Sequence, residues 1–432
     1  MNEIRSRLDE LRELGLYRRM RMVSGPQGPR VLLDGSPVLL LCSNNYLGLA
    51  DHPRVREAAA DAAMRWGVGA GASRLVSGTM TIHRRLEEQL AEFESSPACV
   101  LFGSGYLANI GVISSLAGEQ EIVFSDSLNH ASIVDGCRLA RAQTFVYDHC
   151  DMDHLEWGLR NAEGRAALIA TDSVFSMDGD IAPLEQIAEL AQRYDVRVVV
   201  DEAHATGAVG PGGRGAVAAA GLEDEIDVIV GTLGKALGSY GAYACASSEI
   251  VQLLINTARP LVFSTALPPP AVAGALAALE VLREQPRRVD KLQTGAALLR
   301  RELRNAGAAV CEQGTQVVPL LVGDPKLAVR VCELALAQGV FAQAIRPPTV
   351  PAGTSRLRLA VMASHTAGEL TRAAQVLASA AAEAGVSFAG SAPAPALAPP
   401  AHAHSPARVR DRDELPAHAL FDFESEPVAR AA

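Results

Sequence analysis

The sequence predicts an α/β fold with a mainly parallel central sheet, helices on both faces of that sheet, and a smaller C-terminal α/β domain. Between about residues 50 and 265, short apolar runs alternate with stretches of helical periodicity, and most of these runs lack polar alternation. Strands that are buried on both faces of a parallel sheet have this pattern. After about residue 285, a second and shorter series of helices and strands begins.

The N-terminal part, residues 1–48, is expected to form a helix and an arm ahead of the main sheet. Leucines at positions 8, 11, 14 and 16 recur among charged residues and predict a helix over about 1–22. A short extended region follows, in which the turn Leu33–Ser36 leads into the apolar run 39–41.

The large domain is predicted to span residues 49–285, and six apolar runs mark the strands of its sheet. These runs are 99–102, 122–124, 145–147, 167–170, 196–200 and 228–230. The small domain is predicted to span residues 286–387, with helices at 286–306, 326–338 and 366–384 and strands at 317–322 and 357–360. Residues 388–432 are rich in alanine and proline and predict a disordered tail, because such a segment buries too little apolar surface to offset its ordering entropy.

Composition excludes several classes of protein. The chain of 432 residues carries a net charge of -10, which disfavours nucleic acid or an anionic membrane as its main partner. No apolar run approaches transmembrane length, and the charged N-terminus does not resemble a signal peptide. The seven cysteines form no Cys-x-x-Cys pair and no metal-ligand spacing, so we expect reduced thiols, a cytoplasmic location and no metal site.

Lys235 is one of only three lysines, against 36 arginines, and its setting is unusual for a solvated charge. It follows the apolar run 228–230 and lies within a segment of small residues, Gly231–Ser239. Arginine stays protonated, whereas a desolvated lysine can lose its proton and attack a carbonyl carbon. On local context alone, Lys235 can equally be a lysine without a function that was by chance not replaced by arginine.

Polar residues and glycines follow five of the predicted strands. Because ligands of open α/β sheets bind outside the carboxyl ends of the strands, these segments predict the site. They are Gly103–Asn109, Ser125–Ser132, Thr171–Asp180, Asp201–Gly207 and Thr232–Lys235. The first is a glycine turn that opens a helix, where free backbone N–H groups and the helix dipole favour a phosphate group.

The spacing G-x-G-x-x-A in residues 103–108, with Asp126 about 20 residues later, mimics a dinucleotide-binding fingerprint. Taken alone, it favours a nicotinamide-dependent dehydrogenase. It does not account for Asp201, His204 or Lys235, each of which also follows a strand. A phosphate-binding turn with an aspartate, a histidine and a lysine fits pyridoxal phosphate better, since that cofactor needs a Schiff-base lysine and an aspartate that keeps its pyridine nitrogen protonated.

Five motifs in this order resemble the α-oxoamine synthase family of fold-type I pyridoxal-phosphate enzymes, and the resemblance covers about residues 5–385. The motifs are Ser43–Leu49, Asp126–Ser132, Val174–Asp180, Asp201–His204 and Thr232–Lys235. The resemblance implies a pyridoxal 5'-phosphate cofactor, a decarboxylative condensation of an amino acid with an acyl thioester, and a homodimer with shared active sites. Residues 344–358 are most similar to family members that join L-alanine to a pimeloyl group on coenzyme A or a carrier protein. Members that use glycine with acetyl-CoA are the alternative.

The resemblance also implies roles for individual residues around the cofactor. The expected catalytic residues are the Schiff-base lysine and proton carrier Lys235, the pyridine-nitrogen partner Asp201, the 3-oxygen partner His204 and the ring-stacking His130. The expected phosphate ligands are Ser104, Gly105, Tyr106 and Thr232, with Thr265 reaching the phosphate bound by the other subunit. Ser176 is expected at the 3-oxygen, and Asp172 matches a position where relatives carry an acid.

The expected substrate-binding residues are Arg18, Asn44, Thr349 and Arg358. Asn44 and Arg358 match the positions that bind the amino-acid carboxylate, for which a planar guanidinium is well suited. Arg18 matches an N-terminal arginine that meets the acyl substrate.

One position departs from the family pattern, because Ala205 stands where glycine is usual. If this residue needs a positive φ, alanine costs about 1 kcal/mol of strain. Taken singly, the site residues also have ordinary explanations: His130 as a loop residue, Asp201 as a helix N-cap and Arg358 as a surface charge. Their order and joint match to one chemistry favour an enzyme over a non-catalytic binding protein of the same fold.

Overall fold

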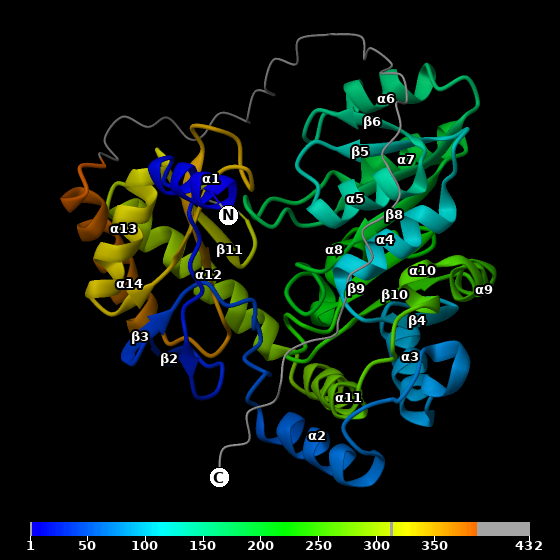
Figure 1. Ribbon diagram of the computed structural model, residues 1–432, viewed down its shortest axis with the longest axis horizontal. Coiled ribbons are helices and arrows are strands. Elements are labelled where there is room, and N and C mark those ends of the chain that lie inside the picture. Colours follow the sequence, from blue (N-terminus) through cyan, green and yellow to red (C-terminus); the bar gives the residue numbers. More distant parts are fainter. Residues whose placement is uncertain (1, 312–313, 387–432) are drawn as a thin grey trace. The chain divides into compact units, whose positions relative to one another are not determined.

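In the computed structural model, which describes residues 2–311 and 314–386, the central sheet has the strand order β4-β10-β9-β8-β7-β5-β6 (Figure 1). The strands from β9 to β6 are mutually parallel, whereas β10 runs antiparallel to both β4 and β9. Their bounds are β4 Ala98–Phe102, β5 Ile122–Asp126, β6 Gln143–Tyr147, β7 Ala166–Asp172, β8 Arg197–Asp201, β9 Val228–Thr232 and β10 Ala242–Ala246. All six predicted strands are present. β10 was missed because three of its five residues are alanine, so it has little apolar contrast with the helices around it.

Helices cover both faces of this sheet, as the unalternating strands predicted. On one face Val100 and Phe102 pack in a hydrophobic cluster with α4, α5 and α9, whereas Leu101 belongs to a second cluster with α3, α6, α7 and α11. The helices are α3 Thr81–Phe93, α4 Gly105–Leu116, α5 Ala131–Ala140, α6 Met152–Arg160, α7 Leu184–Tyr194, α9 Ser248–Thr257 and α11 Pro269–Glu284. Three further helices are α2 Pro53–Trp66, α8 Gly215–Ala220 and α10 Arg259–Val262.

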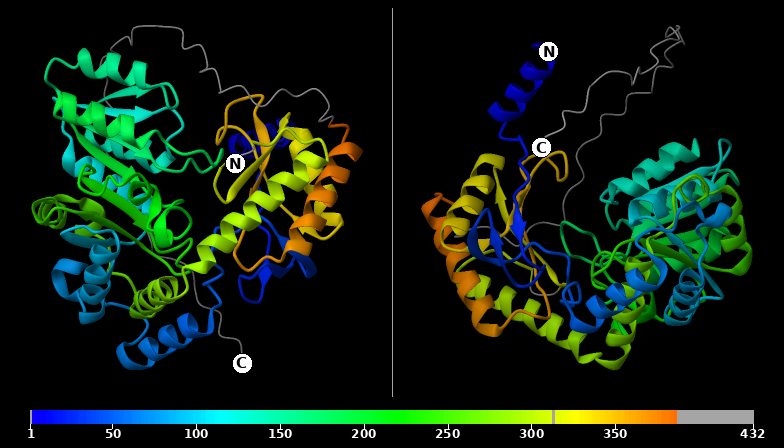
Figure 2. Two further views of the ribbon diagram at one scale, coloured as in Figure 1. Left: turned by 180° about the vertical axis from the view of Figure 1, so that it is seen from behind. Right: turned by 60° about the horizontal axis from the view of Figure 1, so that its bottom comes forward.

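The C-terminal part contains a small antiparallel sheet in the order β11-β14-β13. Figure 2 shows helices α12, α13 and α14 beside this sheet, and they contact its strands or one another. The bounds are α12 Arg287–Asn305, β11 Val317–Gly323, α13 Pro325–Ala337, β13 Gln343–Ile345, β14 Ser355–Ala360 and α14 Ala367–Glu383. The predicted helices and strands of this part are confirmed to within about two residues, and among the residues that the structure describes there, the short β12 and β13 were missed.

The N-terminal arm joins the C-terminal part through strand pairing. β1, β2 and β3 form a meander, and β3 pairs in parallel with β12, which comes some 300 residues later. The bounds are β1 Val23–Ser24, β2 Arg30–Leu33, β3 Ser36–Leu40 and β12 Val340–Phe341. The described residues lie in one compact unit, so the boundary proposed at residue 285 stays a prediction.

One expectation for the backbone was wrong. The predicted helix over 1–22 is shorter, because α1 spans Asn2–Glu13 and Gly15 then takes a left-handed φ of +68° that ends the helix. At Ala205 the condition for strain is not met, because this fully buried residue is not among the described residues with positive φ, whereas Gly207 nearby has a φ of +76°.

The predicted tail at 388–432 lies outside the described residues. Among the helices described, none is both long and apolar enough to cross a bilayer.

Candidate active site

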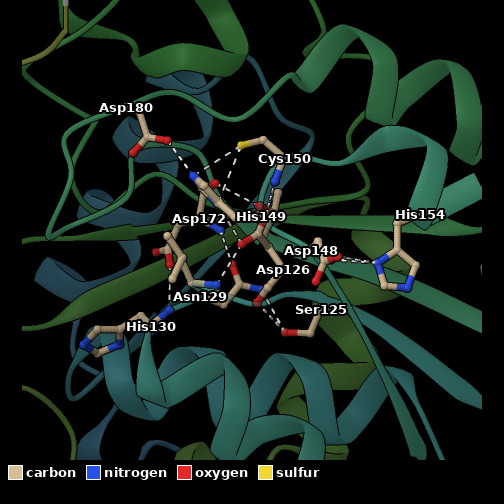
Figure 3. Close-up of polar contacts among 12 residues, drawn as sticks. Ser125, Asp126, Asn129, His130, Asp148, His149, Cys150, His154, Asp172 and Asp180 are labelled. Atoms are coloured by element: carbon tan, nitrogen blue, oxygen red, sulfur yellow. Dashed lines mark hydrogen bonds and ion pairs between the residues drawn. The ribbon is translucent and has the colours of Figure 1, made fainter. Parts of the chain in front are cut away.

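The carboxyl ends of β7 and β8 place two acidic residues side by side. Asp172 and Asp201 are paired in register at the ends of these parallel strands, and both are buried. Burial, together with the nearby charge of Asp201, raises the pKa of Asp172 well above its usual value. The backbone N–H of His130 donates to Asp172 Oδ2 over 2.7 Å, so this acid also anchors the loop after β5 (Figure 3).

Asp201 is held by donors from two directions. The side chain of Asn109 on α4 donates to Oδ2 at 2.6 Å, and the backbone N–H of Ala203 donates to Oδ1 at 2.8 Å. Asn109 Nδ2 also lies 2.9 Å from Ser132 Oγ, which in turn lies 2.7 Å from His130 Nδ1. A continuous set of hydrogen bonds therefore connects the buried carboxylate to the imidazole of His130, which is exposed to solvent.

A line of polar contacts begins at Lys235, which follows β9. Its Nζ lies 2.7 Å from His204 Nε2, and His204 Nδ1 lies 2.6 Å from the hydroxyl oxygen of Tyr46. Tyr46 donates to Asn44 Oδ1 at 3.1 Å, and Arg358 donates to both Asn44 Oδ1 and the Tyr46 hydroxyl. With these partners, a neutral His204 with its proton on Nδ1 satisfies every group in the line.

The electrostatics of this line favour uncharged forms of Lys235 and His204. Burial lowers the pKa of Lys235 to about 8. Burial lowers the pKa of His204 well below its usual value, and the positive charges of Lys235 and Arg358 add to the effect. The amine is therefore available as a base or nucleophile much nearer neutral pH than that of an ordinary lysine.

The loop 174–181, which follows β7, meets two arginines of β14. Arg358 donates through Nε to the backbone carbonyl of Ser176, and Arg356 pairs with the carboxylate of Asp178. Ser176 thus contributes its carbonyl oxygen to the site in this structure. Arg358 is the basic group that this loop and Asn44 hold beside Lys235.

The start of α4 and the end of β9 form the predicted phosphate cradle. Ser104 is the N-cap of α4, where its side chain accepts a hydrogen bond from the N–H of Leu107. Gly105 and Tyr106 follow in the first turn, whose N–H groups have no partner inside the helix. A Cβ added to Gly105 would meet only the Cβ of Thr232, at 4.0 Å, so the helix start is uncrowded and lies near the side chain of that residue.

These groups fit pyridoxal phosphate. A helix N-terminus with two flanking hydroxyls suits the phosphate, a buried aspartate suits the pyridine nitrogen, and an amine of lowered pKa suits the aldehyde.

Three predicted residues form no hydrogen bond with this cluster in the described part of the chain, although Thr265 lines a small pocket together with Gly103. Arg18 and Thr349 are exposed and are near Arg346: the N–H of Thr349 donates to the Arg346 carbonyl, and the Arg18 charge helps burial to lower the pKa of Arg346. Thr265 is exposed and forms an isolated antiparallel bridge with Ser73.

Sequence reasoning missed three residues that hold the site together. Tyr46 lies inside the quoted motif Ser43–Leu49 and Asn109 ends the glycine turn, so both had a local signal. Gln316 had none: its side chain donates to the backbone carbonyl of His204 at 2.7 Å from 112 residues further along the chain.

Fold and site together define an enzyme of the fold-type I pyridoxal-phosphate class. Residues 36–377 match the family described as aminotransferase class I and II, and the chain belongs to this family. The chain is 50% identical over 386 residues to 8-amino-7-oxononanoate synthase of Geobacter sulfurreducens, with 89% of this chain and 99% of that protein covered. It is 48% identical over 389 residues to the protein of the same name from Citrifermentans bemidjiense, with 89% and 100% covered.

Solved structures of related enzymes have the same fold. Serine palmitoyltransferase of Sphingomonas wittichii superposes with a TM-score of 0.84 at 30% identity, over 89% of this chain and 98% of that one. The 8-amino-7-oxononanoate synthase of Francisella tularensis superposes with a TM-score of 0.69 at 25% identity, over 79% and 97%. These likenesses confirm the predicted family resemblance, the fold type and the cofactor.

Proposed function

We propose that this protein is an 8-amino-7-oxononanoate synthase, which condenses L-alanine with a pimeloyl thioester and releases CO2. The choice of substrates rests on the relatives at 48–50% identity, which the chain matches over nearly their whole length. The chemistry rests on one observation, the Lys235 amine of lowered pKa at 2.7 Å from His204 and close to the buried Asp201. The acyl carrier is coenzyme A or a carrier protein.

Bound pyridoxal phosphate withdraws electrons from the α-carbon of the amino acid and makes its proton acidic. Lys235 would hold the cofactor and, once displaced by alanine, would remove that proton through its neutral amine. Arg358 and Asn44 would bind the alanine carboxylate, and the guanidinium offers two parallel donors for it. His204 would keep the Lys235 amine oriented through their 2.7 Å contact.

The atoms balance over the reaction. The α-carbon of alanine forms a bond to the thioester carbonyl carbon, and the bond from that carbon to sulfur breaks; the thiolate that leaves takes a proton from solvent. The bond from the α-carbon to the carboxylate then breaks and releases CO2. Lys235, protonated in the first step, returns its proton to the same carbon. Arg358 and Asn44 would therefore hold the alanine carboxylate from substrate binding until that group is released as CO2.

A cytoplasmic homodimer is part of the proposal. All seven cysteines lie in the described part of the chain and are free, which suits a reducing compartment. Leu75, Val76 and Phe263, beside the bridge between Ser73 and Thr265, expose 54%, 79% and 70% of their surface, and apolar side chains gathered in this way favour a subunit interface. Light scattering should give twice the chain mass, and Thr265→Ala should weaken cofactor binding.

The decisive test measures thiol release by the purified protein with three substrate pairs. These are alanine with pimeloyl-CoA, glycine with acetyl-CoA, and serine with palmitoyl-CoA, with the product identified by mass spectrometry. Fastest release with the first pair is expected. Faster release with either other pair would assign the protein to another member activity, and no cofactor absorbance after reconstitution would indicate a non-catalytic protein.

A further inference from the structure

His149 lies between two carboxylates outside the group of residues assigned to the reaction (Figure 3). Its Nδ1 is 2.9 Å from Asp126 Oδ1, and its Nε2 is 2.7 Å from Asp180 Oδ2. The imidazole is partly buried and packs edge-on against Phe175, with ring centroids 4.4 Å apart. Cys150 Sγ lies 3.6 Å and 3.7 Å from the two ring nitrogens. We call Asp126, His149 and Asp180 the His149 bridge.

The two carboxylates belong to different loops of the site. Asp126 ends β5 and accepts the N–H groups of Leu128 and Cys150, so it shapes the turn that leads to His130. Asp180 belongs to the loop 174–181, whose Ser176 carbonyl accepts a hydrogen bond from Arg358. The His149 bridge therefore connects the loop that carries His130 to the loop that contacts Arg358.

Geometry assigns a positive charge to His149. An ionised carboxylate only accepts hydrogen bonds, so two carboxylate contacts require a proton on each ring nitrogen. Burial opposes this charge, but hydrogen bonds to Asp126 and Asp180 outweigh it and raise the pKa of His149 to about 12. Donor atoms of Asp126, His149 and Cys150 lie within 4.8 Å of one another, a spacing that a metal ion also uses. An imidazolium accounts for both ring contacts without one.

We propose that His149 is a positioning residue that, by joining Asp126 to Asp180, fixes the loop 174–181 and thereby the position of Arg358 in the amino-acid site. The proposal rests on the proposed function only for the identity of the amino acid.

The two ends of the bridge differ in how they are otherwise held. The loop of His130 has independent anchors, since Asp172 accepts its backbone N–H and Asn129 donates to Ser125 and to the carbonyl of Ala170. The loop 174–181 is anchored at its start by the fully buried Val174 and Phe175, whereas residues 176–180 rely on short-range backbone hydrogen bonds, on Thr315, which donates to the Gly179 carbonyl, and on contacts with Arg356 and Arg358. Loss of His149 should therefore make the loop 174–181, which contacts Arg358, more mobile and leave the loop that carries His130 in place.

The test uses the reconstituted holoprotein with His149→Gln and Asp180→Asn, alone and combined. The matched control is His154→Gln. His154 lies nearby on α6 and pairs with Asp148 at 3.4 Å, but among the described residues this pair does not reach the loop 174–181. One readout is hydrogen exchange of the backbone amides of residues 175–180, which needs no substrate. The second is the dissociation constant for alanine, from the absorbance change of the holoprotein.

We expect His149→Gln to speed exchange at 175–180 and to weaken alanine binding roughly tenfold, the scale of one charge-assisted hydrogen bond. Cofactor affinity, KM for the acyl thioester and kcat at saturating alanine should stay near the wild-type values. Both single changes break the same bridge. The double variant should therefore bind alanine with about the same affinity as whichever single variant binds it less tightly. His154→Gln should behave as the wild type.

Unchanged exchange in His149→Gln would overturn the proposal, as would independent, multiplying effects of His149→Gln and Asp180→Asn. A stoichiometric metal ion that is present in the wild type and lost in His149→Gln would also overturn it, in favour of a metal site. A wild-type protein that binds none of alanine, glycine and serine would instead refute the proposed function, and the exchange experiment would still decide the role of His149.

Discussion

Two histidines near the same edge of the central sheet are in opposite charge states. His204 lies between Lys235 and Tyr46, and its pKa is lowered by burial and by the charges of Lys235 and Arg358. His149 lies between Asp126 and Asp180, and its pKa is raised to about 12 although burial opposes the change. Burial therefore acts in the same direction on both, and the neighbours decide the charge.

This difference separates the site into two halves with different tasks. In the half around Lys235, burial lowers the pKa of an amine and an imidazole, and the positive charge of Arg358 adds to the effect, so both groups are available for proton transfer. The half around His149 pairs a cation with two anions, an arrangement suited to holding loops in place. We therefore expect changes in the first half to alter chemistry and changes in the second to alter position.

The largest effect is expected for Lys235→Ala. Removing the cofactor anchor and general base should lower turnover by about 10³-fold or more, while circular dichroism stays that of the folded protein. Lys235→Arg is the sharper variant, because it keeps a positive charge beside His204 but has no amine that can attack the cofactor. Turnover by Lys235→Arg above a few per cent would contradict the assignment.

The next largest effect is expected for Arg358→Lys, and it should be on binding of the amino acid. A lysine keeps the charge but cannot donate to Asn44 and Tyr46 while presenting a fork to the carboxylate, so KM for the amino acid should rise by about 10- to 100-fold. Steady-state kinetics at fixed acyl thioester measure this, with Arg193→Lys on α7 as an exposed control. An unchanged KM would place the carboxylate site elsewhere.

The lowered pKa of Lys235 predicts how cofactor capture depends on pH. In the apoprotein only the neutral amine attacks the aldehyde, so the rate should rise about tenfold per pH unit below pH 8 and level off above it. An ordinary lysine would level off only near 10.5. Stopped-flow absorbance after mixing with pyridoxal phosphate measures the profile, and a rate still rising at pH 9.5 would contradict the lowered pKa.

The most direct test of the comparison is on stability. The pKa of His149 is raised on folding, so the stability that it contributes is complete below its unfolded pKa, near 6.5, and declines as pH rises toward 12. The pKa of His204 is lowered, so folding loses stability through this group as pH falls below 6.5. Urea unfolding of the apoproteins from pH 5.5 to 9 measures both.

The stability advantage of the wild type over His149→Gln should therefore shrink with rising pH, whereas its advantage over His204→Gln should grow between pH 5.5 and 6.5. Slopes of the same sign would show that burial, rather than the neighbours, sets the charge of both histidines.

Much of the fold was predictable because its signals are local. Each parallel strand is a short apolar run, and the segments that follow these runs carry Asp201, His204 and Lys235 to one edge. β10 was not predictable in this way, since its alanines become a strand only by pairing between β4 and β9. The length of α1 was also overestimated, because the leucine spacing continues past Gly15, where the backbone leaves the helix.

The sequence by itself determined which chemical groups reach the sheet edge, because strand ends and glycine turns depend on residues that are neighbours in the chain. Only the tertiary structure decided their charge and partners. Lys235 and His204 depend on Tyr46 and Arg358, and the loop 174–181 depends on His149, all brought in from distant segments. A pKa is set by charges and donors within a few ångströms, and those distances exist only once the chain has folded.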